Sequence, residues 1–166
     1  MIDPMTLQSI SILVSSIGLI IALVYYTVNI RNQNRTRQAQ LLMQVYNRFD
    51  SPDKVRAYQE VFHWEFRDFE EYSEKYGRNN NPEAHNNLTS LIVFFEGIGT
   101  LVKTRDLPID RVYLLMGGLT IILWEKFELV KEQIREDLNF PRWACETEYL
   151  YNELIRYRAE HPELKT

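Results

Sequence analysis

The chain has 166 residues, enough for one domain with an appendage but too few for two catalytic domains. Hydrophobic residues make up 45% of the sequence and aromatic residues 13%, which excludes a globally disordered chain. The single cysteine, Cys145, excludes an intrachain disulfide and a cysteine-rich zinc site, and the net charge of −4 divides into regions of opposite sign.

The first predicted element is a membrane-spanning helix. Residues 6–30 contain no Asp, Glu, Lys, Arg or His, and most are Ile, Leu, Val or Tyr. As a helix this run would reach about 37 Å, more than the roughly 30 Å hydrocarbon core of a bilayer. A cleavable signal peptide is the alternative, but it needs basic residues before the apolar run, and only Met1-Ile2-Asp3-Pro4-Met5 precedes this one. The sequence therefore predicts a short tail and a retained transmembrane helix within residues 1–30.

Charge on either side of this run predicts its orientation. Segment 31–48 contains four arginines and no acidic residue, whereas residues 49–166 contain 15 basic and 22 acidic side chains, a net charge of −7. Basic residues next to a span resist translocation, so we expect a single-pass protein of the cell membrane with its N-terminus outside and its C-terminal part in the cytoplasm. A part with this negative charge is also unsuited to binding nucleic acid. The arginines expected to contact anionic lipid headgroups are Arg31, Arg35 and Arg37.

Small and polar residues recur along the predicted span at steps of three and four. This spacing places them on one helical face, which we call the seam. In lipid, small residues let helix backbones approach and polar residues form interhelical hydrogen bonds, so the seam favours helix association, although such residues also occur by chance in single spans. The seam residues are Gln8, Ser11, Ser15, Gly18, Ala22, Tyr25 and Asn29.

The apolar spacing after residue 30 predicts that the anchor helix continues to about Phe49, so residues 31–50 form a basic juxtamembrane extension. Ser51-Pro52-Asp53 has the composition of a helix start, which opens a bundle over residues 51–166. Asp68 and Glu71 have the spacing of a capping box, which indicates either a break or a third short helix that ends at Gly77.

The rest of the chain also reads as helical. Pro82 suits the start of the next helix, and the apolar stretches 88–95 and 112–124 are too short to span a bilayer, so they are expected to be buried core helices. Each carries a glycine pair that would let the helices approach closely. The second stretch is expected to continue to Leu138, and Pro141 to begin a last helix. Without any sustained alternation typical of strands, the sequence predicts an all-α bundle of about five helices.

Four stretches together resemble a family of small microbial membrane-anchored proteins catalogued as a domain of unknown function. The resemblance covers most of residues 25–158 in order. It implies an N-terminal anchor and a helical cytoplasmic part, and it implies no catalytic residues. The stretches are QAQLLMQVYNRFDSP (residues 38–52), FFEGIGTLVK (94–103), LWEKFE (123–128) and EYLYNELIRY (148–157).

Few residues suggest chemistry. Glu60 and His63 have a metal-ligand spacing, but a di-iron bundle needs a second such pair and the sequence has none, so no metal or cofactor is predicted. Glu96 lies in an apolar stretch, where a carboxylate needs a partner. The residues expected to form a buried ion-pair network are Glu96, Arg111, Glu125 and Lys126.

These observations favour a membrane-anchored helical module that either self-associates or serves as an accessory subunit of a membrane complex, without catalysis. The expected partners are the lipid bilayer and either further copies of the chain or another membrane protein. A homo-oligomeric pore lined by the seam is the alternative, although the seam carries no charge to select ions. An enzyme built on Glu60, His63 and Glu96 is a weaker third hypothesis.

Overall fold

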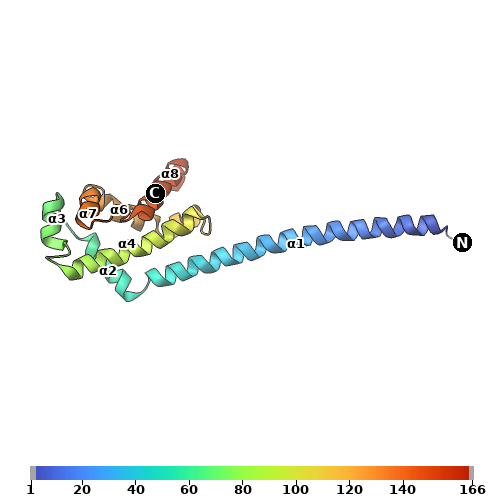
Figure 1. Ribbon diagram of the computed structural model, residues 1–166, viewed down its shortest axis with the longest axis horizontal. Helices are drawn as coiled ribbons and strands as arrows, with labels where there is room; N and C mark the ends of the chain where they lie inside the picture. The colour runs from blue at the N-terminus through green and yellow to red at the C-terminus, as the bar shows by residue number, and fades with distance from the viewer. Residues whose placement is uncertain (1–2, 165–166) are drawn as a thin grey trace. The chain divides into compact units, whose positions relative to one another are not determined.

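The computed structural model describes residues 3–164, and every regular element in this range is a helix (Figure 1). The predicted all-α fold with a long apolar N-terminal helix is confirmed. Met1 and Ile2, the start of the predicted outer tail, lie outside the described residues, as do residues 165 and 166. The chain divides into two compact units whose boundary falls between Gln40 and Leu41.

The first helix, α1 (Pro4–Phe49), runs for 46 residues without a break, as the sequence predicted. Pro4 is tolerated at its start because the first turn of a helix has no partner for the missing N–H. Most of α1 forms the first unit. Its last turns belong to the second unit, which we call the helical body, and contribute apolar side chains to the core there, namely Leu41, Leu42, Val45 and Phe49.

Three helices open the body: α2 (Pro52–Phe62), α3 (Phe69–Tyr76) and α4 (Pro82–Lys103). All three helices begin where the sequence predicted, although the Ser51 side chain does not cap α2 and its hydroxyl donates to the Arg48 carbonyl oxygen instead. The Asp68 carboxylate accepts a hydrogen bond from the Glu71 N–H at 2.9 Å, and the Asn81 side chain accepts one from the Ala84 N–H at 3.1 Å. Both bonds satisfy N–H groups that a helix leaves unpaired in its first turn.

The next segment differs from the prediction of one helix from Val112 to Leu138. It consists of α5 (Ile109–Val112), a π-helical turn η1 (Tyr113–Gly117), α6 (Gly118–Phe127) and α7 (Lys131–Asp137). Residues 128–130 form a turn between α6 and α7, and Val130 in this turn is buried. The predicted end after Leu138 is correct, because Asn139 adopts a left-handed conformation with φ of 48° that closes α7.

The last long helix, α8 (Cys145–Glu160), precedes a short 3₁₀ turn, η2 (Pro162–Leu164). The prediction that Pro141 begins this helix is wrong. Residues 141–144 form turns that bury Trp143, and Ala144 takes a left-handed conformation with φ of 57° directly before α8.

The core of the body forms around α4, which packs against α2 and α8 (Figure 1). Gly99 of α4 makes the contact with α8 close, since a Cβ atom there would lie 2.0 Å from the Glu146 carbonyl oxygen. The sequence predicted a close approach between the two glycine-bearing helices, but the structure brings Gly99 against α8 instead of against the segment of Gly117 and Gly118. The largest completely buried side chains include Leu91, Phe95, Trp124, Phe127, Leu150 and Leu154.

Candidate functional site

Among residues 3–164, α1 is the one helix long and apolar enough to cross a membrane. Soluble core helices and signal sequences share that length and composition. None of the side chains in the most apolar window of α1 is buried against the rest of the chain. The large apolar side chains from Met5 to Val28 are between about half and three-quarters exposed. An apolar surface of this extent needs a nonaqueous environment or a partner.

The seam lies within this exposed part of α1. Its two serines differ from the other serine and threonine residues of the apolar stretch whose side chains the structure describes. Ser9, Ser16 and Thr27 each donate a hydrogen bond to the carbonyl oxygen four residues earlier, at 2.8–2.9 Å. Ser11 and Ser15 donate no hydrogen bond to any residue in the described part of the chain. The seam hydroxyls are therefore available to a neighbouring helix.

The remaining seam residues are also exposed, and a Cβ atom at Gly18 would meet no other residue within 4 Å. The predicted headgroup residues Arg31, Arg35 and Arg37 lie on the exposed polar continuation of α1. Arg31 and Arg35 share a face because they are one helical turn apart.

The predicted ion pair of Glu96 is wrong. The carboxylate of Glu96 accepts hydrogen bonds from the Thr147 N–H at 2.7 Å and from the Thr147 hydroxyl at 3.2 Å. Thr147 lies in the first turn of α8, where backbone N–H groups lack partners and the helix dipole favours a negative charge. Ala144, the residue before α8, has no side chain that can cap it. A carboxylate from α4 therefore caps α8, and the helix terminus replaces the expected cation.

The two cations predicted as partners of Glu96 lie elsewhere. The Arg111 side chain is 66% exposed and lies 3.5 Å from the Asp110 carboxylate. The Lys126 ammonium donates hydrogen bonds to the carbonyl oxygens of Phe62 and Trp64, at 2.7 and 2.6 Å, and so closes the C-terminal end of α2. Partial burial lowers the pKa of Lys126.

Glu125, and Glu60 and His63 of the predicted metal spacing, contact nearby residues of the body. Glu125 is exposed and lines a shallow depression beside Leu129. Glu60 accepts a hydrogen bond from the Asn87 side chain at 2.6 Å, and Nδ1 of His63 lies 2.6 Å from the Gln59 carbonyl oxygen. No group of three or more His, Cys, Asp or Glu side chains within the described range is placed to hold a metal ion.

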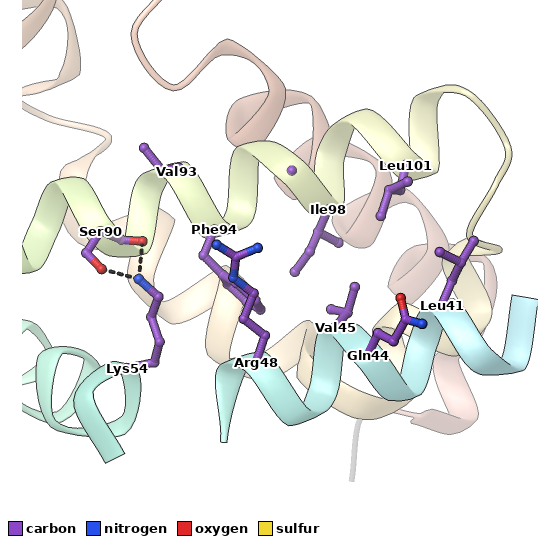
Figure 2. A pocket seen from close by; sticks show the side chains of 11 residues that line it. Leu41, Gln44, Val45, Arg48, Lys54, Ser90, Val93, Phe94, Ile98 and Leu101 are labelled. Carbon is purple, nitrogen blue, oxygen red and sulfur yellow. Dashed lines mark hydrogen bonds between the residues drawn. The ribbon is translucent and has the colours of Figure 1, made fainter. Parts of the chain in front are cut away.

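A groove of about 300 Å³ lies on the body between the last turns of α1, the start of α2, and α4 (Figure 2). Its floor and walls are mainly apolar, and two cationic side chains lie toward one end. Figure 2 shows the Arg48 guanidinium and the Lys54 ammonium both directed toward α4, where Lys54 donates hydrogen bonds to the backbone carbonyl and hydroxyl oxygens of Ser90. The apolar lining residues are Leu41, Val45, Val93, Phe94, Gly97, Ile98 and Leu101, and Gln44 completes the lining.

Sequence reasoning missed this groove. It counted Arg48 only toward the orientation of the membrane helix, and it interpreted Gly97 as part of a glycine pair for close helix packing. A Cβ atom at Gly97 would in fact meet no other residue within 4 Å. The sequence offered one signal, a glycine next to exposed apolar residues on a helix that also carries a buried face.

Comparison with known proteins places most of the chain in one family. The model of a family described as "Domain of unknown function (DUF4760)" matches residues 12–154. The match includes most of the apolar part of α1 and nearly all of the helical body, and it confirms the resemblance to a domain of unknown function. No curated protein and no solved structure matches the chain.

Proposed function

We propose that this chain, which belongs to the family described as "Domain of unknown function (DUF4760)", is a single-pass membrane protein whose helical body is an assembly module at the cytoplasmic surface. The observation that carries the proposal is the uncharged stretch of α1, whose most apolar window contains no buried residue. In water about two dozen exposed, mostly apolar residues would be strongly unfavourable, whereas in a bilayer they match the hydrocarbon core.

The orientation of the proposed anchor follows from charge. Arg31, Arg35 and Arg37 follow the uncharged stretch within about two helical turns, and no acidic residue lies between the end of this stretch and Asp50. Arginines at this place keep the following body in the cytoplasm and contact anionic headgroups, each with about 1 kcal/mol of favourable free energy.

The seam supports assembly within the membrane. Ser11 and Ser15 have hydroxyls without partners among the described residues, and Gly18 leaves space beside them. In hydrocarbon a hydroxyl gains by finding an acceptor on a neighbouring helix, and a small residue permits the close approach that this needs. Self-association through the seam is therefore the form of assembly that we propose.

Membrane orientation is tested by labelling an added cysteine with a membrane-impermeant maleimide. The variant carries Cys145→Ser and Glu160→Cys, because Glu160 is an exposed residue at the end of α8. We expect labelling in inside-out vesicles and none in intact cells, and we expect the intact mass of the protein to include α1. Labelling in intact cells, a cleaved N-terminus, or a protein that stays in solution without detergent would overturn the proposed anchor or its orientation.

The assembly state is tested by the mass of the particle solubilised in detergent. A stoichiometric homo-oligomer supports self-association, and a fixed complex with another membrane protein supports the accessory role. A monomer without any partner contradicts both. Ion conduction by the purified protein in planar bilayers would instead favour a pore lined by the seam.

A further inference from the structure

The groove on the helical body has two chemically different ends (Figure 2). One end lies between aliphatic side chains of α1 and α4, namely Leu41 and Leu101. The other end carries the Lys54 ammonium, and the Arg48 guanidinium lies between the two ends of the groove. Phe94 is almost completely buried, whereas Val93 remains 64% exposed on the same helix. The groove therefore offers an apolar channel that leads to a cationic end.

The two cations have no carboxylate beside them in the groove, because the residues that line it include no Asp or Glu. Burial lowers the pKa of Lys54, and the neighbouring charge of Arg48 lowers it further, while Asp53 on α2 acts in the opposite direction. Two cations that repel one another next to an apolar surface are stabilised by an anion between them.

The size of the groove limits the ligand. A volume of about 300 Å³ is at the lower end of the range for small-molecule sites. From Leu41 to Arg48 the groove follows about 10 Å of α1. These dimensions fit one acyl chain of medium length.

We infer that the groove binds a single-chain anionic amphiphile of the fatty-acid class. The carboxylate lies between Arg48 and Lys54, and the acyl chain extends along Val45 and Ile98 toward Leu101. Charge complementarity at one end and apolar contact along the rest select this ligand over a neutral or purely polar molecule. The inference concerns the body alone and is independent of the proposed association of α1.

Photolabelling of the full chain tests the inference. The protein is placed in nanodiscs of zwitterionic lipid, and decanoic acid with a photoactivatable group at its far end is added, followed by light and peptide mapping by mass spectrometry. We expect saturable labelling of peptides that contain residues 41–48 and 90–101, and competition by unlabelled decanoic acid. Labelling of residues 6–30 by probe dissolved in the lipid gives an internal reference.

Gly97→Leu adds an apolar side chain to the lining of the groove, and its Cβ atom meets nothing within 4 Å. We expect labelling of residues 41–48 and 90–101 to fall at least roughly tenfold, since the side chain takes up much of a small site. The labelling of residues 6–30 and the melting temperature should not fall. Gly118→Leu is the matched control, because Gly118 on α6 has equally open surroundings and lies outside the groove. It should leave the labelling unchanged.

The charge of the ligand is tested with decanol that carries the same photoactivatable group. We expect the carboxylate probe to label the groove more strongly than the alcohol probe. Arg48→Gln should weaken binding of the carboxylate probe about threefold, as for an exposed ion pair, and Arg56→Gln on α2 should not. Equal labelling by acid and alcohol, unchanged labelling in Gly97→Leu, or no labelling of the groove would each overturn the inference. The inference would also be overturned if a second copy of the chain occupied the groove. In that case the particle mass of Gly97→Leu would differ from that of the wild type.

Discussion

Gly97 and Gly99 lie two residues apart on α4, yet their surroundings are opposite. A Cβ atom at Gly99 would lie 2.0 Å from the Glu146 carbonyl oxygen of α8, whereas a Cβ atom at Gly97 would meet nothing within 4 Å. Both residues are helical and cost backbone entropy there. Close packing compensates for this cost at Gly99, whereas Gly97 leaves open space beside the groove.

Gly99→Ala should therefore destabilise the body by about 2 kcal/mol, because the added methyl group forces α4 and α8 apart. Gly97→Ala should stabilise it by about 0.5 kcal/mol, since alanine has the higher helix propensity. Denaturant unfolding in mild detergent, followed by circular dichroism, measures both changes. If the two variants had equal stability, the close contact at Gly99 would be refuted.

Glu96 gives a second prediction at the scale of single residues. Its carboxylate caps α8 through the Thr147 N–H, so Glu96→Ala should lower the free energy of unfolding by about 1 kcal/mol. Glu96→Gln keeps an acceptor but loses the charge that favours the helix N-terminus, and it should cost about half as much. Glu125→Ala, at an exposed position on α6, is the control and should change stability little. A Glu96→Ala variant as stable as this control would contradict the cap.

At the scale of elements, α7 and α8 are joined through Glu148. Its carboxylate accepts hydrogen bonds from Lys131 at 2.5 Å and from Arg135 at 2.7 Å, both on α7. Burial alone would raise the pKa of Glu148, but the hydrogen bonds and charges of Arg135 and Lys131 outweigh burial and lower it from the ordinary 4.5. The charged form of Glu148 therefore stabilises the packing of α7 on α8.

The lowered pKa of Glu148 predicts how the stability of the body depends on pH. A carboxyl group with a lower pKa in the folded state contributes stability above its unfolded pKa and loses it as the pH falls through the folded value. Glu148→Gln should therefore be less stable than the wild type at about pH 7, and the difference should shrink below about pH 4. Melting temperatures of both proteins across this range measure the effect. A difference that stays constant with pH would show that the charge of Glu148 contributes nothing.

At the scale of the whole molecule, the proposed assembly depends on one face of α1. Ser15 belongs to the seam and has no hydrogen-bond partner among residues 3–164, whereas the adjacent Ser16 lies off the seam and donates to the Ile12 carbonyl oxygen at 2.8 Å. Ser15 and Ser16 can therefore receive the same substitution, one on the seam and one on a different face of α1.

Ser15→Ile and Gly18→Ile should weaken self-association in a membrane roughly tenfold, because a branched side chain removes both the hydroxyl contact and the close backbone approach. Ser16→Ile should have little effect. Energy transfer between labelled copies in liposomes, measured across lipid dilution, gives the association constants. If all three variants associate as the wild type does, the seam plays no part in assembly.

The sequence alone determined the features that depend on local pattern. It predicted the uncharged stretch, the continuation of α1 to Phe49, and the starts of α2, α3 and α4, because helical periodicity and capping residues act over a few neighbouring positions. It also predicted that the stretches 88–95 and 112–124 contribute to the core, although Val93 and Leu114 within them are exposed. The sequence also resembled a domain of unknown function, and the match over residues 12–154 confirms this coarser resemblance, whereas membrane anchoring stays a prediction.

Only the tertiary structure decided what depends on contacts between distant segments. The sequence showed that Glu96 needed a partner, but that partner lies 51 residues away in the first turn of α8. The groove likewise joins α1, α2 and α4, and the different roles of Gly97 and Gly99 depend on which face of α4 meets α8. Local patterns fix which residues form helices, whereas packing fixes which side chains meet, because one apolar face can be buried in several ways.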